Sequence, residues 1–172
     1  FYDSVFHFPK PTIAMIQGYC IGGGMGLAVA CDIRLCEDKS RFAIPAAKLG
    51  LGYGYEGIRR LANLVGPAMV KEIFFTARQF SAGEAQEMGL VNRVLPPHML
   101  APYVDDYAKR ISENAPMTME SVKAIVQAIQ DDESARDLDA LDAMVKACFA
   151  SQDYIEGRRA FMEKRKPDFT GS

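Results

Sequence analysis

The sequence predicts an α/β domain followed by a helical region. Before the Pro96-Pro97 pair, short extended segments rich in β-branched and apolar residues alternate with helical segments. After this pair, the apolar residues recur at helical spacing. We therefore expect an α/β core over residues 1–97 and helices over residues 98–172.

The composition is typical of a folded domain and argues against several classes of protein. The chain has 172 residues, of which 49% are hydrophobic and 24% are charged, so it can bury a core. Its formal net charge of -2 argues against a nucleic-acid binder, which normally has a basic excess. The sequence has no apolar run long enough to span a membrane and no signal-peptide pattern. The four cysteines lack metal-ligand spacing, which indicates reduced thiols, no metal site and a cytoplasmic location.

The stretch from Lys10 to Asp32, KPTIAMIQGYCIGGGMGLAVACD, predicts a site for negative charge. A strand over residues 12–17 is followed by an extended segment over residues 19–21, three glycines at 22–24 and an apolar helix. Glycine lets a ligand approach the main chain closely. The unpaired N–H groups at a helix start, with the helix dipole behind them, can stabilise a developing negative charge.

The glycine run has two other interpretations. It is consistent with a tight turn that lets a helix and a strand pack closely. It also partly matches a dinucleotide-binding fingerprint, but Leu27 stands where that fingerprint requires its last glycine. Because the P-loop motif is missing as well, we do not expect nucleotide binding of these two kinds.

The rest of the core is predicted from turn residues and periodicity. A glycine-rich loop over residues 50–57 contains two tyrosines and Glu56, and loops often present functional groups. Ser81 and Glu84 form a capping-box pair at the start of a short helix. The other expected elements are a helix over residues 67–76 and strands over residues 33–36, 42–44 and 90–95.

The helices expected in the second half are amphipathic. A last helix over residues 151–167 ends in a basic run at residues 164–166. Amphipathic helices need a partner surface for their apolar faces. Two such faces are Val104, Tyr107, Ala108 and Ile111, and Leu138, Leu141, Val145 and Cys148.

Several motifs together resemble the enoyl-CoA hydratase/isomerase family, the crotonase superfamily. The first is KPTIAMIQGYCIGGGMGLAVACDIRL, and the likeness continues in RFAIPAAKLGL, GIRRLANLVG, KEIFFTARQFSAGEAQEMGLVNRVL and AFMEKRKPDF. The resemblance implies a crotonase-like α/β fold with part of a ββα spiral core. It also implies that the C-terminal helices pack a homotrimer or a dimer of trimers. Family members have a preceding N-terminal part with a second oxyanion donor, and we expect that part to be absent here.

The resemblance also implies which residues contact an acyl-CoA substrate. Gly23 would donate one N–H to the thioester oxygen of an enolate. Phe161 and Lys164 match positions that contact the CoA adenine and its phosphate from a neighbouring subunit. Coenzyme A is part of the substrate, and no separate cofactor is implied. Further substrate contacts are expected at Tyr19, Ile21, Gly22 and Tyr55.

Hydratases of the family use two glutamates, and this sequence has neither. The two positions are occupied by Gly26 and Ala46. A hydratase or isomerase could use a relocated base, for which Glu56 is the available carboxylate. The segment RFAIPAAKLGLGYGYEG also resembles methylmalonyl-CoA decarboxylases, which implies that Tyr53 orients a leaving carboxylate while the oxyanion site stabilises the enolate. The third hypothesis is an acyl-CoA binder without catalytic activity.

Overall fold

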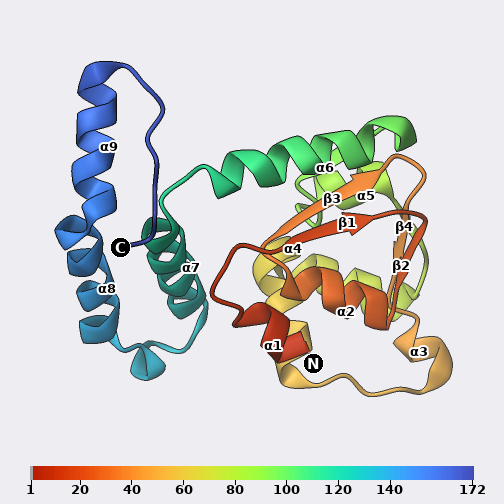
Figure 1. Cartoon of the computed structure of the whole chain (residues 1–172). Helices are drawn as coiled ribbons and strands as arrows, with labels where there is room; N and C mark the ends of the chain where they lie inside the picture. Colours follow the sequence, from red (N-terminus) through yellow and green to blue (C-terminus); the bar gives the residue numbers. More distant parts are fainter. Residues whose placement is uncertain (1) are drawn as a thin grey trace. The chain divides into compact units, whose positions relative to one another are not determined.

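A computed structural model describes residues 2–172 and contains two compact units (Figure 1). The first unit contains Thr12–Asp106 and the residues up to Phe8. The second unit contains Tyr107–Ser172 and Pro9–Pro11. Every strand among the described residues belongs to the first unit.

The strands of the first unit form two sheets of three strands. The first sheet contains, in order, the parallel strands β1 (Ile13–Ile16), β3 (Ile33–Glu37) and β6 (Arg93–Leu95). The second sheet contains, in order, β2 (Tyr19–Ile21), β4 (Arg41–Ala43) and β5 (Phe80–Ser81). β2 and β4 are parallel, whereas β5 pairs antiparallel with β4. Parallel pairing requires long crossover connections, which helices provide here.

The first part of the chain repeats a ββα pattern. β1, β2 and α2 (Gly23–Ala30) form one turn, and β3, β4 and α3 (Ala46–Leu49) form the next. β3 pairs with β1 in one sheet, where Ile33 lies opposite Ile13. β4 pairs with β2 in the other sheet. Each strand of one turn therefore lies beside its counterpart from the other turn, which confirms the partial ββα spiral predicted from the sequence.

A buried arginine fixes the C-terminal end of α2. The Arg34 guanidinium donates hydrogen bonds to the carbonyl oxygens of Ala28 (3.3 Å) and Cys31 (2.6 Å). It also donates one to the carbonyl oxygen of Leu90 at 2.6 Å, and burial lowers the pKa of this guanidinium. A cation here complements the negative end of the helix dipole. The first turn of α2 is therefore the end that suits an anion.

Helix α4 (Tyr55–Thr76) corrects the sequence prediction. The sequence predicts a loop as far as Gly57 and a helix from Pro67, but the helix begins at Tyr55. It contains a kink at Gly66, whose φ of 78° and ψ of 159° are not helical. The Gly-Pro pair interrupts the helical pattern, so periodicity alone does not reveal the first half of α4.

Three shorter elements also differ from the prediction. α1 (Tyr2–Phe6) forms in a segment where no helix is expected, and β5 is a two-residue strand. β6 begins only at Arg93, because the N–H groups of Leu90 and Val91 donate to the Ala85 carbonyl. Tertiary contacts rather than local propensity determine elements this short.

Helix α5 (Ala82–Glu87) begins as predicted. The Ser81 hydroxyl accepts a hydrogen bond from the Glu84 N–H at 3.3 Å, and the Glu84 carboxylate accepts one from the Ser81 N–H at 2.8 Å. These two bonds are a complete capping box. The Glu84 carboxylate also pairs with Arg78 at 2.8 Å, which ties α5 to the segment that follows α4.

A cluster of buried side chains joins α2, α4 and the two sheets into one core. Tyr53, in the segment before α4, packs against this cluster. Its apolar contacts attach this segment to the core. Fully buried members of the cluster include Met25, Phe42, Leu61, Ile73 and Phe80.

The second unit is helical. α7 (Pro116–Gln130) packs against α8 (Leu138–Ala150), and α8 packs against α9 (Gln152–Glu163). The Ser151 hydroxyl caps α9 by accepting a hydrogen bond from the Tyr154 N–H at 3.0 Å. α9 ends earlier than residue 167 because Lys164 adopts a left-handed conformation with a φ of 55°. The unit also contains the end of α6 (Pro97–Ser112) and the short helix η1 (Glu133–Ala135).

Candidate active site

The start of α2 leaves backbone N–H groups without helical acceptors. Gly22 precedes the helix with a φ of 57°, a conformation that favours glycine, and its N–H donates to the Ala43 carbonyl at 2.9 Å. The first bond of the helix joins the Gly26 N–H to the Gly22 carbonyl at 3.0 Å. The N–H of Gly23, at the first helical position, therefore has no acceptor within the helix, and Gly23 is exposed. This arrangement suits the stabilisation of an anion.

Tyr2 of α1 lies over these glycines. A Cβ added to Gly23 would lie 3.0 Å from the Tyr2 hydroxyl oxygen, and one added to Gly26 would lie 3.3 Å from Cζ of the same ring. Figure 1 shows α1 beside α2, and the two helices pack against each other. The Tyr2 ring therefore occupies space that a side chain at position 26 would need. Sequence patterns do not predict this contact.

An ion pair and a cation–π contact fix α1 on α4. The Asp3 carboxylate lies 2.6 Å from Nη2 of Arg60, and this contact lowers the pKa of Asp3. The Arg60 guanidinium carbon lies 4.1 Å from the centroid of the Phe6 ring. The Arg60 side chain is buried, so the contact is shielded from solvent on the arginine side. Together these contacts anchor α1, the helix that contains Tyr2, to α4.

Tyr53 lies at the wall of an apolar cavity. Its ring packs edge-on against Phe74, with the centroids 5.0 Å apart and an angle of 76° between the planes. Burial raises the pKa of Tyr53, and the Tyr2 phenol raises it further. Tyr53 is therefore a neutral phenol that can donate a hydrogen bond at neutral pH.

The cavity beside Tyr53 has a volume of about 320 Å³. Its lining includes Ala46, Leu51, Tyr53, Val70 and Phe74. Ala46, one of the two positions where the family resemblance predicts a glutamate, is buried. The wall here suits an apolar acyl group, and Ala46 cannot act as a base.

Tyr55 and Glu56 lie in the first turn of α4. Tyr55 is 70% exposed. The Glu56 carboxylate lies 2.7 Å from Nη2 of Arg59, and its side chain is 53% exposed. Neither residue is among those that line the cavity beside Tyr53. An exposed carboxylate at this position stabilises the helix start and pairs with Arg59.

β2 leads directly into the glycine run. Tyr19 at its start is 74% exposed, so its ring is accessible to a ligand. Ile21 at its end lies opposite Ala43 of β4 and is partly buried. These residues and Gly22 form a continuous segment that ends at the exposed Gly23 N–H.

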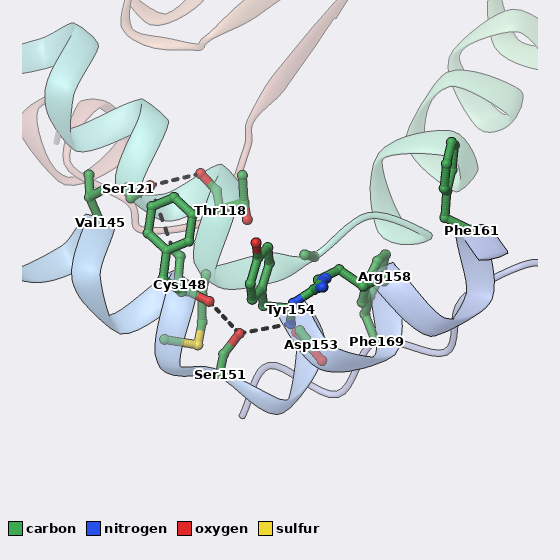
Figure 2. Close-up of a pocket in the computed structure, with 14 residues that line it drawn as sticks. Thr118, Ser121, Val145, Cys148, Ser151, Asp153, Tyr154, Arg158, Phe161 and Phe169 are labelled. Carbon is green, nitrogen blue, oxygen red and sulfur yellow. Dashed lines mark hydrogen bonds between the residues drawn. The ribbon is translucent and has the colours of Figure 1, made fainter.

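The other two predicted substrate-binding residues lie in the second unit. Phe161 is 82% exposed on α9, and Lys164 is the exposed residue that ends this helix. Phe161 lines a cavity of about 590 Å³ whose lining also includes Val145, Tyr154 and Phe169. In Figure 2, Phe161 lies at the opposite end of this cavity from Val145. An exposed aromatic ring and a nearby cation are accessible to a ligand here.

Comparisons with known proteins place the chain in a family. A sequence model described as enoyl-CoA hydratase/isomerase matches residues 1–172. The crotonyl-CoA hydratase of Syntrophomonas wolfei is 41% identical over 162 residues, which are 93% of this chain and 62% of that protein. The carnitinyl-CoA dehydratase of Salmonella arizonae is 36% identical over 171 residues, which are 97% of this chain and 66% of that protein. An enoyl-CoA hydratase/carnithine racemase from Magnetospirillum magneticum has a crystal structure with a TM-score of 0.90 and 35% identity, matching 99% of this chain and 63% of that one.

The fold and the matches define an α/β protein of the crotonase superfamily. The chain belongs to the enoyl-CoA hydratase/isomerase family, as its motifs predict. It spans 62% of the length of the crotonyl-CoA hydratase that it matches.

The remaining features of the described residues concern thiols, metals and membranes. The four cysteines, all within residues 2–172, form no disulfide, and burial raises the pKa of Cys20 to about 11 and that of Cys36 to about 12, so these two are unreactive thiols. Within residues 2–172, histidine, cysteine and carboxylate side chains do not gather in threes that could bind a metal ion. Every helix in this part of the chain is too short or too polar to cross a bilayer.

Proposed function

We propose that this chain forms part of the active site of an enzyme that converts an acyl-CoA thioester through an enolate. The observation that supports this most directly is the exposed Gly23 N–H in the first turn of α2, without an acceptor in the helix. Both curated relatives are named for an acyl-CoA. An enolate is the intermediate that such an N–H can stabilise.

The chemistry follows from the charge of the enolate. When Cα of the thioester loses a proton or a carboxylate, or when water adds to a conjugated double bond, negative charge moves to the thioester oxygen. The Gly23 N–H would donate a hydrogen bond to that oxygen, and the dipole of α2 would add to the attraction. One donor of this kind contributes about 100-fold to 1000-fold to a reaction rate.

Decarboxylation of a malonyl-type thioester is the second candidate reaction, and the position of Tyr53 favours it. The bond between Cα and the carboxylate breaks, its electron pair forms the enolate, and carbon dioxide leaves. This reaction needs no glutamate at positions 26 and 46, and the Tyr53 phenol at the apolar cavity could orient the carboxylate. Hydration or isomerisation instead needs a base, and Glu56 is exposed and paired with Arg59.

The test is a parallel assay of the full-length protein with crotonyl-CoA and methylmalonyl-CoA. Loss of the enoyl absorbance reports hydration, and release of carbon dioxide reports decarboxylation. Hydration that Glu56→Gln abolishes and Tyr53→Phe leaves intact would support a relocated base. Carbon dioxide release that Tyr53→Phe abolishes and Glu56→Gln leaves intact would support the decarboxylase. Saturable CoA binding without turnover of either thioester would indicate a binding protein and overturn the proposed activity.

We also infer that the second unit takes part in self-association and in CoA binding. Phe161 and Lys164 offer a ring for the adenine and a cation for a phosphate, and no cofactor besides CoA is proposed. Exposed apolar side chains need a partner surface. Sedimentation velocity should give a mass of three or six chains, and a monomer would contradict this proposal. The exposed apolar side chains on α7 and α8 include Val122, Val126, Ile129 and Leu138.

A further inference from the structure

Tyr2 places a phenol hydroxyl beside the proposed oxyanion donor. The hydroxyl oxygen lies 3.0 Å from where a Cβ on Gly23 would be, and the ring lies across Gly26. The positions of the two family glutamates carry no carboxylate. The proposed reaction nevertheless needs an acid, because the enolate must gain a proton at Cα before the product leaves.

We infer that the Tyr2 hydroxyl is the acid that protonates Cα of the enolate, an assignment that rests on the proposed function. Cα is bonded directly to the carbonyl carbon whose oxygen would accept the hydrogen bond from the Gly23 N–H. An acid that reaches Cα must therefore lie beside Gly23, as the Tyr2 hydroxyl does. Tyrosine is one of the side chains that act as general acids.

The proton transfer balances without any further reactant. The O–H bond of Tyr2 breaks, and a C–H bond forms at Cα from the electron pair of the enolate double bond. The electrons on the enolate oxygen restore the thioester carbonyl. Tyr2 becomes a phenolate and regains its proton from water, which can reach it because Tyr2 is 41% exposed. The same step completes hydration and decarboxylation, because both pass through this enolate.

The structure holds Tyr2 in a defined position and places a second phenol within electrostatic range. The next residue, Asp3, pairs with the buried Arg60 at 2.6 Å, so the start of α1 is anchored to α4. The Tyr2 phenol contributes to the raised pKa of Tyr53, so the two phenols interact electrostatically. Two phenols allow two roles, in which Tyr53 orients the group that leaves or adds and Tyr2 delivers the proton.

The test replaces Tyr2 with phenylalanine, which retains the ring that packs on Gly26 and removes only the hydroxyl. With whichever of the two thioesters the wild type converts, Tyr2→Phe should lower turnover about 100-fold. In D₂O the wild type should deuterate Cα in a single configuration, whereas Tyr2→Phe should give both configurations because water reaches either face. Deuterium NMR of the CoA product measures this ratio. The matched control is Tyr103→Phe on α6, which should retain the wild-type rate and configuration.

Each outcome distinguishes the assignment from the proposed function. A Tyr2→Phe variant with the wild-type rate and a single deuterium configuration would overturn the role of Tyr2 and leave the proposed function intact. A wild type that converts neither thioester would overturn both. If Tyr2→Phe does not fold, Gly26→Ala provides the second test, because its Cβ would lie 3.3 Å from the Tyr2 ring and displace it. Turnover should then fall about tenfold, and an unchanged rate would contradict the assignment.

Discussion

Each unit of the chain contains a cavity, and the two cavities differ in the groups around them. The cavity beside Tyr53 in the first unit has about 320 Å³, and the cavity of Figure 2 in the second unit has about 590 Å³. In the first unit, a phenol lines the cavity, and a second phenol interacts with it electrostatically and covers the glycines at the start of α2. The smaller cavity is thus the one with groups that can act on a substrate.

The polar side chains that line the second cavity form hydrogen bonds with backbone groups instead. The Ser151 hydroxyl donates to the Cys148 carbonyl at 2.7 Å and caps α9. The Asp153 carboxylate accepts hydrogen bonds from the N–H groups of Thr170 at 2.8 Å and Gly171 at 2.9 Å. A carboxylate used in this way stabilises the fold and has little capacity left for a substrate. Cavity volume alone therefore does not locate the chemistry, and the hydrogen-bond partners of the lining groups are more informative.

The largest expected effect comes from removing the proposed oxyanion donor in the first unit. Gly23→Pro deletes the N–H, and proline is tolerated at the first position of a helix. Turnover should fall about 100-fold or more, because the enolate oxygen loses a donor. Steady-state kinetics on the active thioester measures the loss.

Two controls separate this effect from a general disturbance. Gly23→Ala retains the N–H and places its Cβ 3.0 Å from the Tyr2 hydroxyl, as proline also does, so it measures the disturbance of Tyr2 alone and should lower turnover less than Gly23→Pro. Glu87→Gln alters an exposed side chain of α5 away from the glycine run and should leave turnover unchanged. Equal losses in Gly23→Pro and Gly23→Ala would show that the N–H is not the important group.

The next effect is on stability and belongs to the second unit. Asp153 is buried, and Asp153→Ala leaves two backbone N–H groups without their carboxylate acceptor. The free energy of unfolding should decrease by about 2 kcal/mol, while kcat changes less than about twofold. Chemical denaturation measures the first quantity. Asp153→Asn retains an acceptor oxygen and should cost less, and a large decrease in kcat at unchanged stability would place chemistry in the second unit.

The sequence predicts the elements that neighbouring residues determine. The strand Ile13–Ile16, the helix after the glycine run and the capping box of Ser81 and Glu84 all depend on short-range patterns, and they are confirmed. The first half of α4 is hidden by the kink at Gly66, and β5 exists only because β4 pairs with it. Tertiary pairing of this kind has no local signal.

The same distinction applies to the candidate site. The exposed N–H of Gly23 is predictable because the glycine run and the helix after it are contiguous. Tyr2 is not predictable, since its helix α1 is held by a contact that is distant in the sequence, the ion pair between Asp3 and Arg60, which are 57 residues apart. The catalytic roles of Tyr53 and Glu56 remain predictions.

A smaller effect tests whether the position of Tyr2 depends on that ion pair. Arg60→Met removes the partner of Asp3 and retains an apolar chain of similar length. Because Nε of Arg60 is buried and has no hydrogen-bond partner among the described residues, the free energy of unfolding should change by less than about 1 kcal/mol. Turnover should fall about tenfold, because α1 is released and Tyr2 is displaced. Asp3→Asn retains an acceptor for Arg60 and should have a weaker effect. Unchanged turnover in Arg60→Met would show that the ion pair does not position Tyr2.

The smallest effect concerns a part of the first unit that lies outside the site. Hydrogen bonds from the Ser81 N–H and from Arg78 lower the pKa of Glu84 from its ordinary value of 4.5 to about 2. A carboxylate whose pKa decreases on folding stabilises the folded state above pH 4.5, and this contribution is lost as the pH falls toward 2. As the pH falls over this range, the unfolding temperature of the wild type should therefore decrease more steeply than that of Glu84→Gln. Turnover at neutral pH should be the same in both. Glu87→Gln, which lies outside the capping box, should follow the wild type. If the Glu84→Gln and wild-type curves are parallel, the capping box does not cause the acid sensitivity.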